Sequence, residues 1–333
     1  MRLTIEEVRT ETRALPLEEA RRIARETSAV AEALQVTVSG AGREGRGEAS
    51  PTARWGESLE GLSAQAETAV PALVAEPSRR ALQRLMPAGA ARNAVDAALW
   101  DLEAKQGRRS AEVIAGLAPT HPVTTAYTIP IKPPVEAAEV ARRERGRPLI
   151  KVKLGDFPED RARLKAIRQA APDATLIVDA NEGWSLDQLK AMAPVARDLG
   201  VRLIEQPLRA GADGALEGVD FGVPLCADES CHTRADIPAL AGRYQFINIK
   251  LDKAGGLTEA LAMVEAATAL GLGLMVGSTH GTTLGMAPAF LVGQSCVFCD
   301  LDAPLFLAQR EEEELAYDGS RLDWSRSRRW GLA

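Results

Sequence analysis

From about residue 124 onward, short apolar runs alternate with amphipathic stretches. The runs have the lengths typical of buried strands, whereas stretches such as ALAMVEAATALG repeat apolar residues at helical spacing and end at Gly271. This alternation predicts repeated βα units, which form a parallel sheet through right-handed crossovers. Eight such runs are enough to close a barrel, and they are TTAYTI, PLIKVKL, TLIVDAN, VRLIEQP, PLCADES, FINIKL, GLMVGS and SCVFCDLD.

The first 120 residues follow a different pattern. We expect a strand near the start, the alternating run VAEALQVTVSG, a glycine-rich turn over AGREGRGEAS, and helices that include AARNAVDAALWDLEAKQG. In that helix Ala94, Ala98 and Leu102 share one face. The chain is therefore predicted to contain an α+β capping domain over 1–120, a barrel over 121–302, and a polar, turn-rich segment over 303–333 that packs back on the cap.

Length and composition fit an enzyme with a large core and argue against several other classes. The 333 residues exceed the roughly 250 residues of a barrel by the size of an added domain. The net charge of −6 argues against a nucleic-acid partner, and no apolar run approaches the ~18 residues of a membrane span. The start MRLTIEEVRTETR lacks the apolar core of a secretion signal. We therefore expect a cytoplasmic protein with no membrane partner.

Three acidic residues stand at the ends of consecutive predicted strands. Asp179, Glu205 and Asp228 follow the apolar parts of TLIVDAN, VRLIEQP and PLCADES, about 25 residues apart, which is the length of one βα unit. Any one of them alone is also explained as a helix cap or loop residue. If all three lie at one rim of a parallel barrel, they together offer the oxygen ligands that Mg²⁺ prefers. The sequence thus predicts Mg²⁺ as the cofactor.

Lysines stand in the same phase on the neighbouring strands. Lys151 and Lys153 interrupt LIKVKLG at alternate positions, so both point into the barrel, and Lys250 ends the run in FINIKLDK. Any one of them alone is also explained as a solvated lysine at a strand edge. As a set beside three carboxylates, they predict loss of a proton from a carbon acid next to a carboxylate, through a stabilised enolate. Lys153 and Lys250 would exchange the proton from opposite faces, and Lys151 would assist at the substrate carboxylate.

These motifs in combination resemble the muconate lactonizing branch of the enolase superfamily. The resemblance covers nearly the whole chain and rests on Lys151-Val152-Lys153, Asp179-x-Asn181, Glu205-Gln206-Pro207, Asp228-Glu229-Ser230, Asn248-Ile249-Lys250 with Gly255-Gly256, and the helix NAVDAALWDLEAKQG. It implies an α/β fold, a modified (β/α)7β TIM-type barrel with an α+β N-terminal capping domain. It also implies Mg²⁺ on the three carboxylates, a lysine pair as bases, and a possible homo-oligomer.

Within that branch, Asp300-Leu301-Asp302 is similar to the Asp-x-Asp signature of dipeptide epimerases, where two acidic residues hold the α-ammonium group of the substrate. Two carboxylates on one strand face suit a cation with three donors, although a cap for the next segment also explains them. The resemblance implies an isomerase of the L-Ala-D/L-Glu epimerase type. It would act at the α-carbon of the C-terminal residue of a dipeptide.

Other residues are expected to shape the substrate pocket. Trp55 lies in RWGES, which is similar to a cap loop of these epimerases, Thr128 lies on the first barrel strand, and His280 follows the seventh. A structural role also explains His280. Family members that act on Ala-Glu carry an arginine in an early cap loop, where this chain has Ser28 with Arg25 close by. The resemblance therefore argues against a preference for an acidic side chain and leaves the identity of the preferred dipeptide open.

Two other functions remain open from the sequence. An o-succinylbenzoate synthase or N-acylamino acid racemase would share the lysines and metal ligands but would leave Asp300 and Asp302 unexplained. A catalytically silent barrel that acts as a binding protein would tolerate loss of a metal ligand or lysine, and none is missing. The C-x-x-C pair at Cys296 and Cys299 lacks the further ligands of a zinc site, so small buried residues explain it better.

Overall fold

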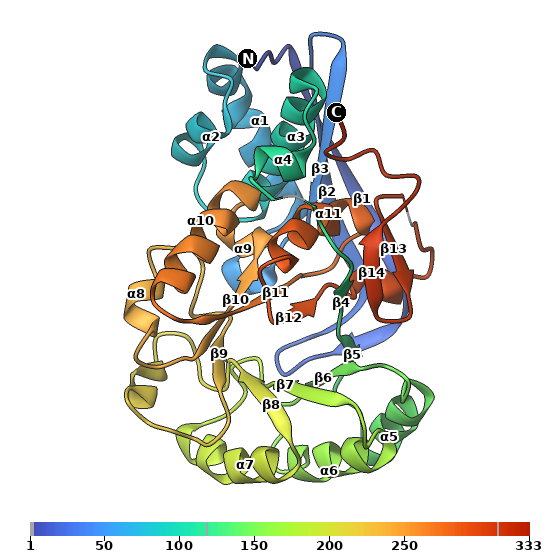
Figure 1. Ribbon diagram of the computed structural model, residues 1–333, viewed down its shortest axis with the longest axis vertical. Coiled ribbons are helices and arrows are strands. Elements are labelled where there is room, and N and C mark those ends of the chain that lie inside the picture. The colour runs from blue at the N-terminus through green and yellow to red at the C-terminus, as the bar shows by residue number, and fades with distance from the viewer. Residues whose placement is uncertain (1–2, 118, 312) are drawn as a thin grey trace.

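The N-terminal third of the chain forms a three-stranded antiparallel sheet covered by helices, which we call the cap. The computed structural model describes residues 3–117, 119–311 and 313–333, and Figure 1 shows the cap, largely in blue, above the barrel. The sheet has the order β1–β2–β3. The elements of the cap are β1 (Glu7–Arg22), β2 (Thr27–Gly40), β3 (Arg43–Ala49), η1 (Ala53–Trp55), α1 (Leu59–Ala75), α2 (Arg79–Leu85), α3 (Ala90–Gly107) and α4 (Ala111–Ile114).

In the described part of the chain, eight parallel strands follow and close into a barrel. Each of them pairs with the next in sequence, and the N–H of Ala126 donates to the carbonyl oxygen of Cys299 at 2.8 Å where the first and last runs meet. The predicted α/β barrel is therefore confirmed, and each strand lies within one of the eight predicted runs. The strands are β5 (Tyr127–Ile129), β6 (Leu149–Lys153), β7 (Thr175–Asp179), β8 (Val201–Glu205), β9 (Leu225–Ala227), β10 (Phe246–Lys250), β11 (Gly273–Gly277) and β12 (Phe298–Asp300). Between them lie α5 (Pro134–Arg143), α6 (Asp160–Ala170), α7 (Leu186–Asp198), η2 (Asp213–Leu216), α8 (Ile237–Leu240), α9 (Leu251–Ala254), α10 (Leu257–Ala269) and α11 (Thr283–Gly293).

The barrel interior has an apolar layer directly below the polar strand ends. One buried cluster contains Ala126, Leu149, Ile177, Leu203, Cys226 and Met275. Ile177 lies two residues before Asp179, so strand alternation points both side chains to the inner face. Val178, between them, belongs to the larger core under the helices and is equally buried. Because both faces are covered, the runs read as uniformly apolar until the polar residue at the end.

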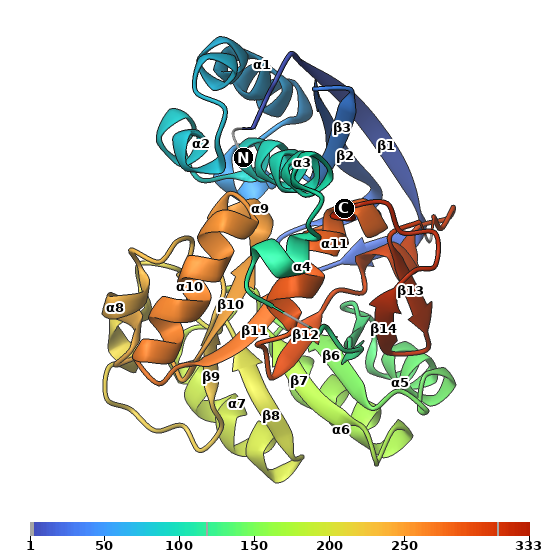
Figure 2. The same cartoon turned by 45° about the horizontal axis from the view of Figure 1, so that its top comes forward.

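The C-terminal segment lies against both the barrel and the cap. After η3 (Ala303–Phe306), β13 (Leu315–Asp318) and β14 (Arg321–Trp324) form a small antiparallel sheet with β4 (Val123–Thr124). Farther on, the indole N–H of Trp330 donates to the carbonyl oxygen of Ala97 in α3 at 3.1 Å, and Figure 2 shows the C-terminus close to α3 and α11. The domain boundaries at residues 120 and 302 remain our proposal.

The turn in the glycine-rich segment after β2 is shorter than the sequence predicts. Only Ala41 and Gly42 lie between β2 and β3, and Arg43–Ala49 is a strand, so the prediction of a turn over the whole segment was wrong. The glycines serve a different purpose. A Cβ on Gly45 would lie 2.1 Å from the carbonyl oxygen of Ala98, and one on Gly47 would lie 2.1 Å from that of Ala94. They let α3 pack directly on the strand backbone.

Substitution of alanine for Gly47 is expected to lower the free energy of unfolding by about 1–3 kcal/mol, because the added methyl group forces strand and helix apart. Gly107→Ala is the matched control, since Gly107 ends the same helix and a Cβ there meets nothing within 4 Å. Urea unfolding followed by circular dichroism measures both variants. Equal midpoints for the two variants would show that the close approach of α3 to β3 contributes nothing.

Candidate active site

The carboxyl ends of the barrel strands bring the predicted polar residues to one rim. The strand register pairs Lys153 with Asp179 and Asp179 with Glu205, so these three strands end level with one another. On the other side of the barrel, Lys250 pairs with Gly277, which pairs with Asp300. The residues that end these strands therefore lie side by side rather than at different depths of the barrel.

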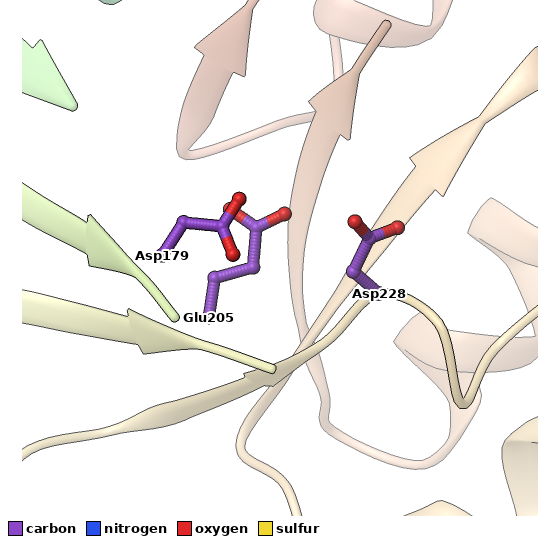
Figure 3. A group of neighbouring side chains, drawn as sticks. All are labelled: Asp179, Glu205 and Asp228. Atoms are coloured by element: carbon purple, nitrogen blue, oxygen red, sulfur yellow. The ribbon is translucent and has the colours of Figure 1, made fainter. Parts of the chain in front are cut away.

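Asp179, Glu205 and Asp228 converge at this rim. Each offers a carboxylate oxygen within 4.8 Å of those of the other two, and all three residues are buried. Figure 3 shows the three side chains reaching from neighbouring strand ends into the same space. The side-chain amide of Asn181 donates to Asp179 at 3.2 Å, and that of Asn248 donates to Glu205 at 2.7 Å. Two of the carboxylates are thus held in place by neutral donors.

Two lysines of β6 lie next to this acidic group. The Nζ of Lys151 is 2.6 Å from Glu205, 2.6 Å from Asp300 and 3.1 Å from Asp179. Burial lowers the pKa of Lys151, but the charges of Asp300 and the other carboxylates raise it by more, so the ammonium group stays charged. Lys153 lies 2.7 Å from Asp179, and its side chain is 13% exposed where Lys151 is fully buried. Lys151 is therefore a fixed cation, whereas Lys153 reaches the surface of the site.

Lys250 approaches from the opposite side of the barrel mouth. Strand β10 is the fourth strand after β6 in the eight-stranded barrel, and the Nζ of Lys250 lies 2.7 Å from Asp228. Burial lowers the pKa of Lys250, but the negative charge of Asp228 raises it by more. Lys253, in α9, binds the other oxygen of Asp228 at 2.6 Å and donates to the carbonyl oxygen of Cys231 at 2.9 Å. Two ammonium groups thus hold Asp228.

The three carboxylates differ in how readily they ionise. Burial and the nearby charge of Asp179 raise the pKa of Glu205 to about 7. Burial also acts to raise the pKa of Asp228, but the positive charges of Lys250 and Lys253 lower it by more. The buried Oδ1 of Asn181 accepts no hydrogen bond from the residues that the structure describes. A buried set of three carboxylates with a spare oxygen acceptor beside it fits a hard divalent cation such as Mg²⁺.

A cavity of about 360 Å³ lies between the cap and the barrel mouth. From the cap, its lining includes Arg21, Arg25, Ser28, Ser50, Thr52 and Glu57. From the barrel, its lining includes Thr128, Lys153, Lys250, His280, Asp300 and Asp302. The two predicted bases therefore face the same space, whose volume is typical of small-molecule sites.

Asp300 and Asp302 lie at one edge of this cavity beside Thr128. Asp300 accepts a hydrogen bond from Lys151 at 2.6 Å and one from the Thr128 hydroxyl at 3.2 Å. Asp302 accepts the backbone N–H of Thr128 at 2.6 Å, and no cationic group of the described residues lies within 4.0 Å of it. Burial and the charge of Asp300 raise the pKa of Asp302 to about 6. Asp302 thus presents a carboxylate without a cationic partner to the cavity.

His280 and Trp55 have different positions. His280 lines the cavity, and burial together with the charge of Arg21 lowers its pKa to about 4, so the imidazole is neutral near pH 7. Trp55 lies outside the cavity. Its ring meets the ring of His232 edge to face, with centroids 4.1 Å apart, and the guanidinium of Arg54 lies over it. His280 thus lies at the predicted site, whereas Trp55 packs against His232 and does not line the cavity.

The arginines near the turn between β1 and β2 have other contacts than the sequence predicted. Arg25 lines the cavity, but its guanidinium lies 2.6 Å from Glu229 and is engaged there. Ser28 lines the cavity at the position where the resemblance places an arginine. Its partner on β1 is Arg21, which the sequence analysis missed. The register is irregular between Pro16 and Arg21, so simple alternation along β1 does not reveal which side chains face the cavity.

Comparisons with known proteins agree with this geometry. Residues 4–115 match the mandelate racemase/muconate lactonizing enzyme N-terminal domain, and residues 134–323 match the enolase C-terminal domain-like family. An L-Ala-D/L-Glu epimerase of Escherichia coli (strain K12) is 44% identical over 302 residues, which cover 90% of this chain and 94% of the relative.

Two solved structures extend the likeness over almost the whole chain. The first is an enolase family member from Agrobacterium tumefaciens with homology to dipeptide epimerases and with bound sodium and L-Ala-L-Glu. It has a TM-score of 0.93 and 45% identity, and the match covers 97% of this chain and 99% of that one. The second is a dipeptide epimerase from Methylococcus capsulatus complexed with Mg and L-Arg-D-Lys. It has a TM-score of 0.87 and 31% identity, with 97% and 98% covered.

Proposed function

Since the chain belongs to the mandelate racemase/muconate lactonizing enzyme family of the enolase superfamily, we propose that it is a Mg²⁺-dependent dipeptide epimerase. The reaction removes the α-proton of the C-terminal residue of a dipeptide from one face of the carbon and adds a proton to the opposite face. One observation carries the proposal. Lys153 and Lys250 stand on opposite sides of the barrel mouth, and both line one cavity.

The two lysines would act in turn as base and acid. One accepts the α-proton at its Nζ, and the other donates a proton from the opposite face, so the configuration at the carbon inverts. Each ammonium group lies 2.7 Å from a carboxylate, Lys153 from Asp179 and Lys250 from Asp228. When Asp228 holds a cation, Lys250 loses most of the negative charge that raises its pKa. The neutral amine, which can act as a base, then becomes more accessible.

Asp179, Glu205 and Asp228 would hold the Mg²⁺, in keeping with their oxygen donors and burial. A bound Mg²⁺ supplies a Lewis acid for the substrate carboxylate, where negative charge increases as the α-proton leaves. Lys151 adds a fixed positive charge at the same end of the substrate, 2.6 Å from Glu205. Because Lys151 is fully buried and does not line the cavity, we assign it to charge stabilisation and not to proton transfer.

Asp300 and Asp302 would hold the α-ammonium group of the dipeptide. Asp302 is the stronger candidate of the two, since Asp300 already pairs with Lys151 at 2.6 Å. A carboxylate without a cationic partner, at the edge of the cavity that holds both bases, suits an ammonium group with three donors. N-acylated amino acids carry no such group, so this contact distinguishes the proposed substrate class from theirs.

Replacement of Asp302 by asparagine is expected to lower kcat/KM for dipeptides roughly 10- to 100-fold at pH 8, because hydrogen bonds to charged groups contribute about 1.5–3 kcal/mol. The deficit should shrink as the pH falls below 6, since the pKa of the wild-type carboxylate is raised to about 6 and protonation removes its charge. The ratio of wild-type to variant kcat/KM, measured between pH 5 and 8, separates the contribution of the Asp302 carboxylate from that of groups present in both proteins. A ratio that does not change with pH would contradict the assignment, as would an equal loss with N-acetylated amino acids.

The proposed function is tested by incubating mixed L,L-dipeptides with the enzyme and Mg²⁺ in D₂O. A dipeptide that is epimerised gains one deuterium at its α-carbon, and chiral chromatography then identifies the L,D product. N-acetylated amino acids and a precursor of o-succinylbenzoate serve as the competing substrates. Conversion of either competitor without any epimerised dipeptide would sink the proposal.

We also propose that the enzyme works in the cytoplasm on small peptides, with neither nucleic acid nor membrane as a partner, and as a homo-oligomer. All four cysteines are unpaired, as is usual in a reducing compartment, and the net charge is −6. In the described ranges, none of the helices combines the length and apolar character needed to cross a bilayer.

A further inference from the structure

Gln206 directly follows Glu205 at the end of β8, and its backbone has an unfavourable conformation. Its φ is 32°, in the left-handed region that residues other than glycine rarely adopt. The residue is fully buried, and it does not line the cavity. A strained backbone of this kind persists only where the surrounding contacts enforce it, and such positions are common at functional sites. The contacts of Gln206 therefore indicate what the strained conformation supports.

The backbone of Gln206 joins β8 to the two neighbouring segments that carry proposed metal ligands. Its N–H donates to the carbonyl oxygen of Cys226 in β9 at 2.9 Å, two residues before Asp228. Its own carbonyl oxygen accepts the N–H of Glu182 at 2.8 Å, three residues after Asp179. Since Gln206 is also bonded covalently to the third ligand, one residue connects the segments of all three carboxylates.

The side-chain amide of Gln206 binds the turn after β9. Its Oε1 accepts the backbone N–H groups of Asp228 at 2.8 Å and of Ser230 at 3.1 Å. Its Nε2 donates to the carbonyl oxygen of Leu208 at 2.8 Å and lies 2.9 Å from the Ser230 hydroxyl and 3.1 Å from the Tyr244 hydroxyl. The amide thus holds the turn that begins at the proposed ligand Asp228.

A buried carboxylate on the far side of this amide fixes its orientation. Asp213 is 2% exposed and accepts the Ser230 hydroxyl at 2.6 Å and the Tyr244 hydroxyl at 3.0 Å. Because both hydroxyl groups donate to Asp213, their oxygens are left as acceptors for the amide nitrogen of Gln206. The nitrogen of the amide therefore faces the two hydroxyls, and its oxygen faces the backbone N–H groups of the turn.

We propose that Gln206 is a positioning residue for the metal site and sets the spacing of Asp179, Glu205 and Asp228. Three carboxylates with oxygens within 4.8 Å of one another repel when no cation lies between them, so their spacing needs support from the surrounding chain. Gln206 supplies that support from outside the cavity and acts only through the ligands. The inference rests on the metal ligands of the proposed function and adds the residue that arranges them.

Gln206→Met is expected to raise the Kd for Mg²⁺ roughly 10- to 100-fold, because partners that orient metal ligands contribute that much to metal affinity. Methionine has a similar length but cannot accept the N–H of Asp228. Gln206→Asn is a second variant, since asparagine tolerates a positive φ but its shorter side chain cannot reach the same partners, and a rise of at least about 5-fold is expected. Titration calorimetry with Mg²⁺ alone, on the full chain without substrate, measures both variants.

The matched control is Gly47→Ala, which is expected to destabilise the packing of β3 on α3 in the cap and to leave the Kd for Mg²⁺ unchanged. Thermal unfolding gives a second readout, because the stabilisation by a bound ion depends on its Kd. A fixed excess of Mg²⁺ should raise the melting temperature of the wild type and of Gly47→Ala equally. The same excess should raise the melting temperatures of the two Gln206 variants by less.

A loss of metal-free stability with a wild-type Kd for Mg²⁺ in the Gln206 variants would show that the residue is only structural, and it would overturn the proposal. If Gln206→Met does not fold, Gln206→Asn decides by the same two measurements. Unchanged Mg²⁺ affinity in the variants defeats only this inference. A wild-type protein that binds no Mg²⁺ defeats the metal ligands of the proposed function and this inference with them.

Discussion

Alanine in place of Lys153 is expected to abolish epimerisation of dipeptides, and alanine in place of Lys250 is expected to do the same. Each substitution removes one of the two groups that exchange the α-proton, and a positioned acid or base contributes roughly 10²- to 10⁴-fold to the rate. Because the remaining lysine reaches only one face of the carbon, it cannot replace the missing one. We expect kcat to fall at least about 10³-fold in both directions.

Isotope exchange gives the more specific result. A variant with one lysine can still remove the α-proton that points toward that lysine and return a deuteron to the same face. In D₂O, Lys153→Ala should therefore exchange the α-proton of only one dipeptide isomer, and Lys250→Ala that of the other. Lys165→Ala, which changes an exposed lysine of α6, is the control and should retain full activity. Normal epimerisation by either active-site variant would refute the two-base assignment.

The catalytic rim was predictable because it depends on two regular periods. The βα repeat sets the spacing of Asp179 and Glu205 along the chain, and the two-residue period of a strand sets the face of Lys151 and Lys153. Parallel strands end at the same rim, so residues at equivalent positions of successive βα units lie close together in the structure. The structure pairs Lys153 with Asp179 and Asp179 with Glu205 for this reason.

The rest of the site depends on contacts that no period records. The cavity position of Arg21 follows from an irregular register between β1 and β2, and the placement of Trp55 follows from its contact with His232. Lys253 lies in a short helix directly after β10, where helical geometry turns its side chain back to Asp228. A charged residue in the segment LDKAGG, next to a predicted base, was the available signal for it. Gly45 marks a helix packing on a strand, and from sequence alone that pattern is indistinguishable from a turn.

The metal site leads to the second large effect. Glutamine in place of Glu205 is expected to weaken Mg²⁺ binding at least about 100-fold and to remove epimerase activity, since it deletes one of three charged ligands. The side chain keeps its shape and can still accept the hydrogen bond from Asn248, which is 2.7 Å long in the wild type. The loss of Mg²⁺ binding would thus result from the missing negative charge and not from a change in packing. Titration calorimetry with Mg²⁺ alone measures binding separately from catalysis, and EDTA followed by added Mg²⁺ measures the dependence of activity on the metal.

The pH dependence of this binding distinguishes Glu205 from its neighbours. Because burial and Asp179 raise the pKa of Glu205 to about 7, a proton competes with the cation below that pH. The apparent Kd for Mg²⁺ in the wild-type protein should therefore rise about tenfold per pH unit below 7. Glu205→Gln should lose this dependence, and Glu229→Gln should keep it, since Glu229 is also buried at the rim but pairs with Arg25. If Glu205→Gln bound Mg²⁺ as tightly as the wild type at pH 8, Glu205 would not be a ligand of the cation.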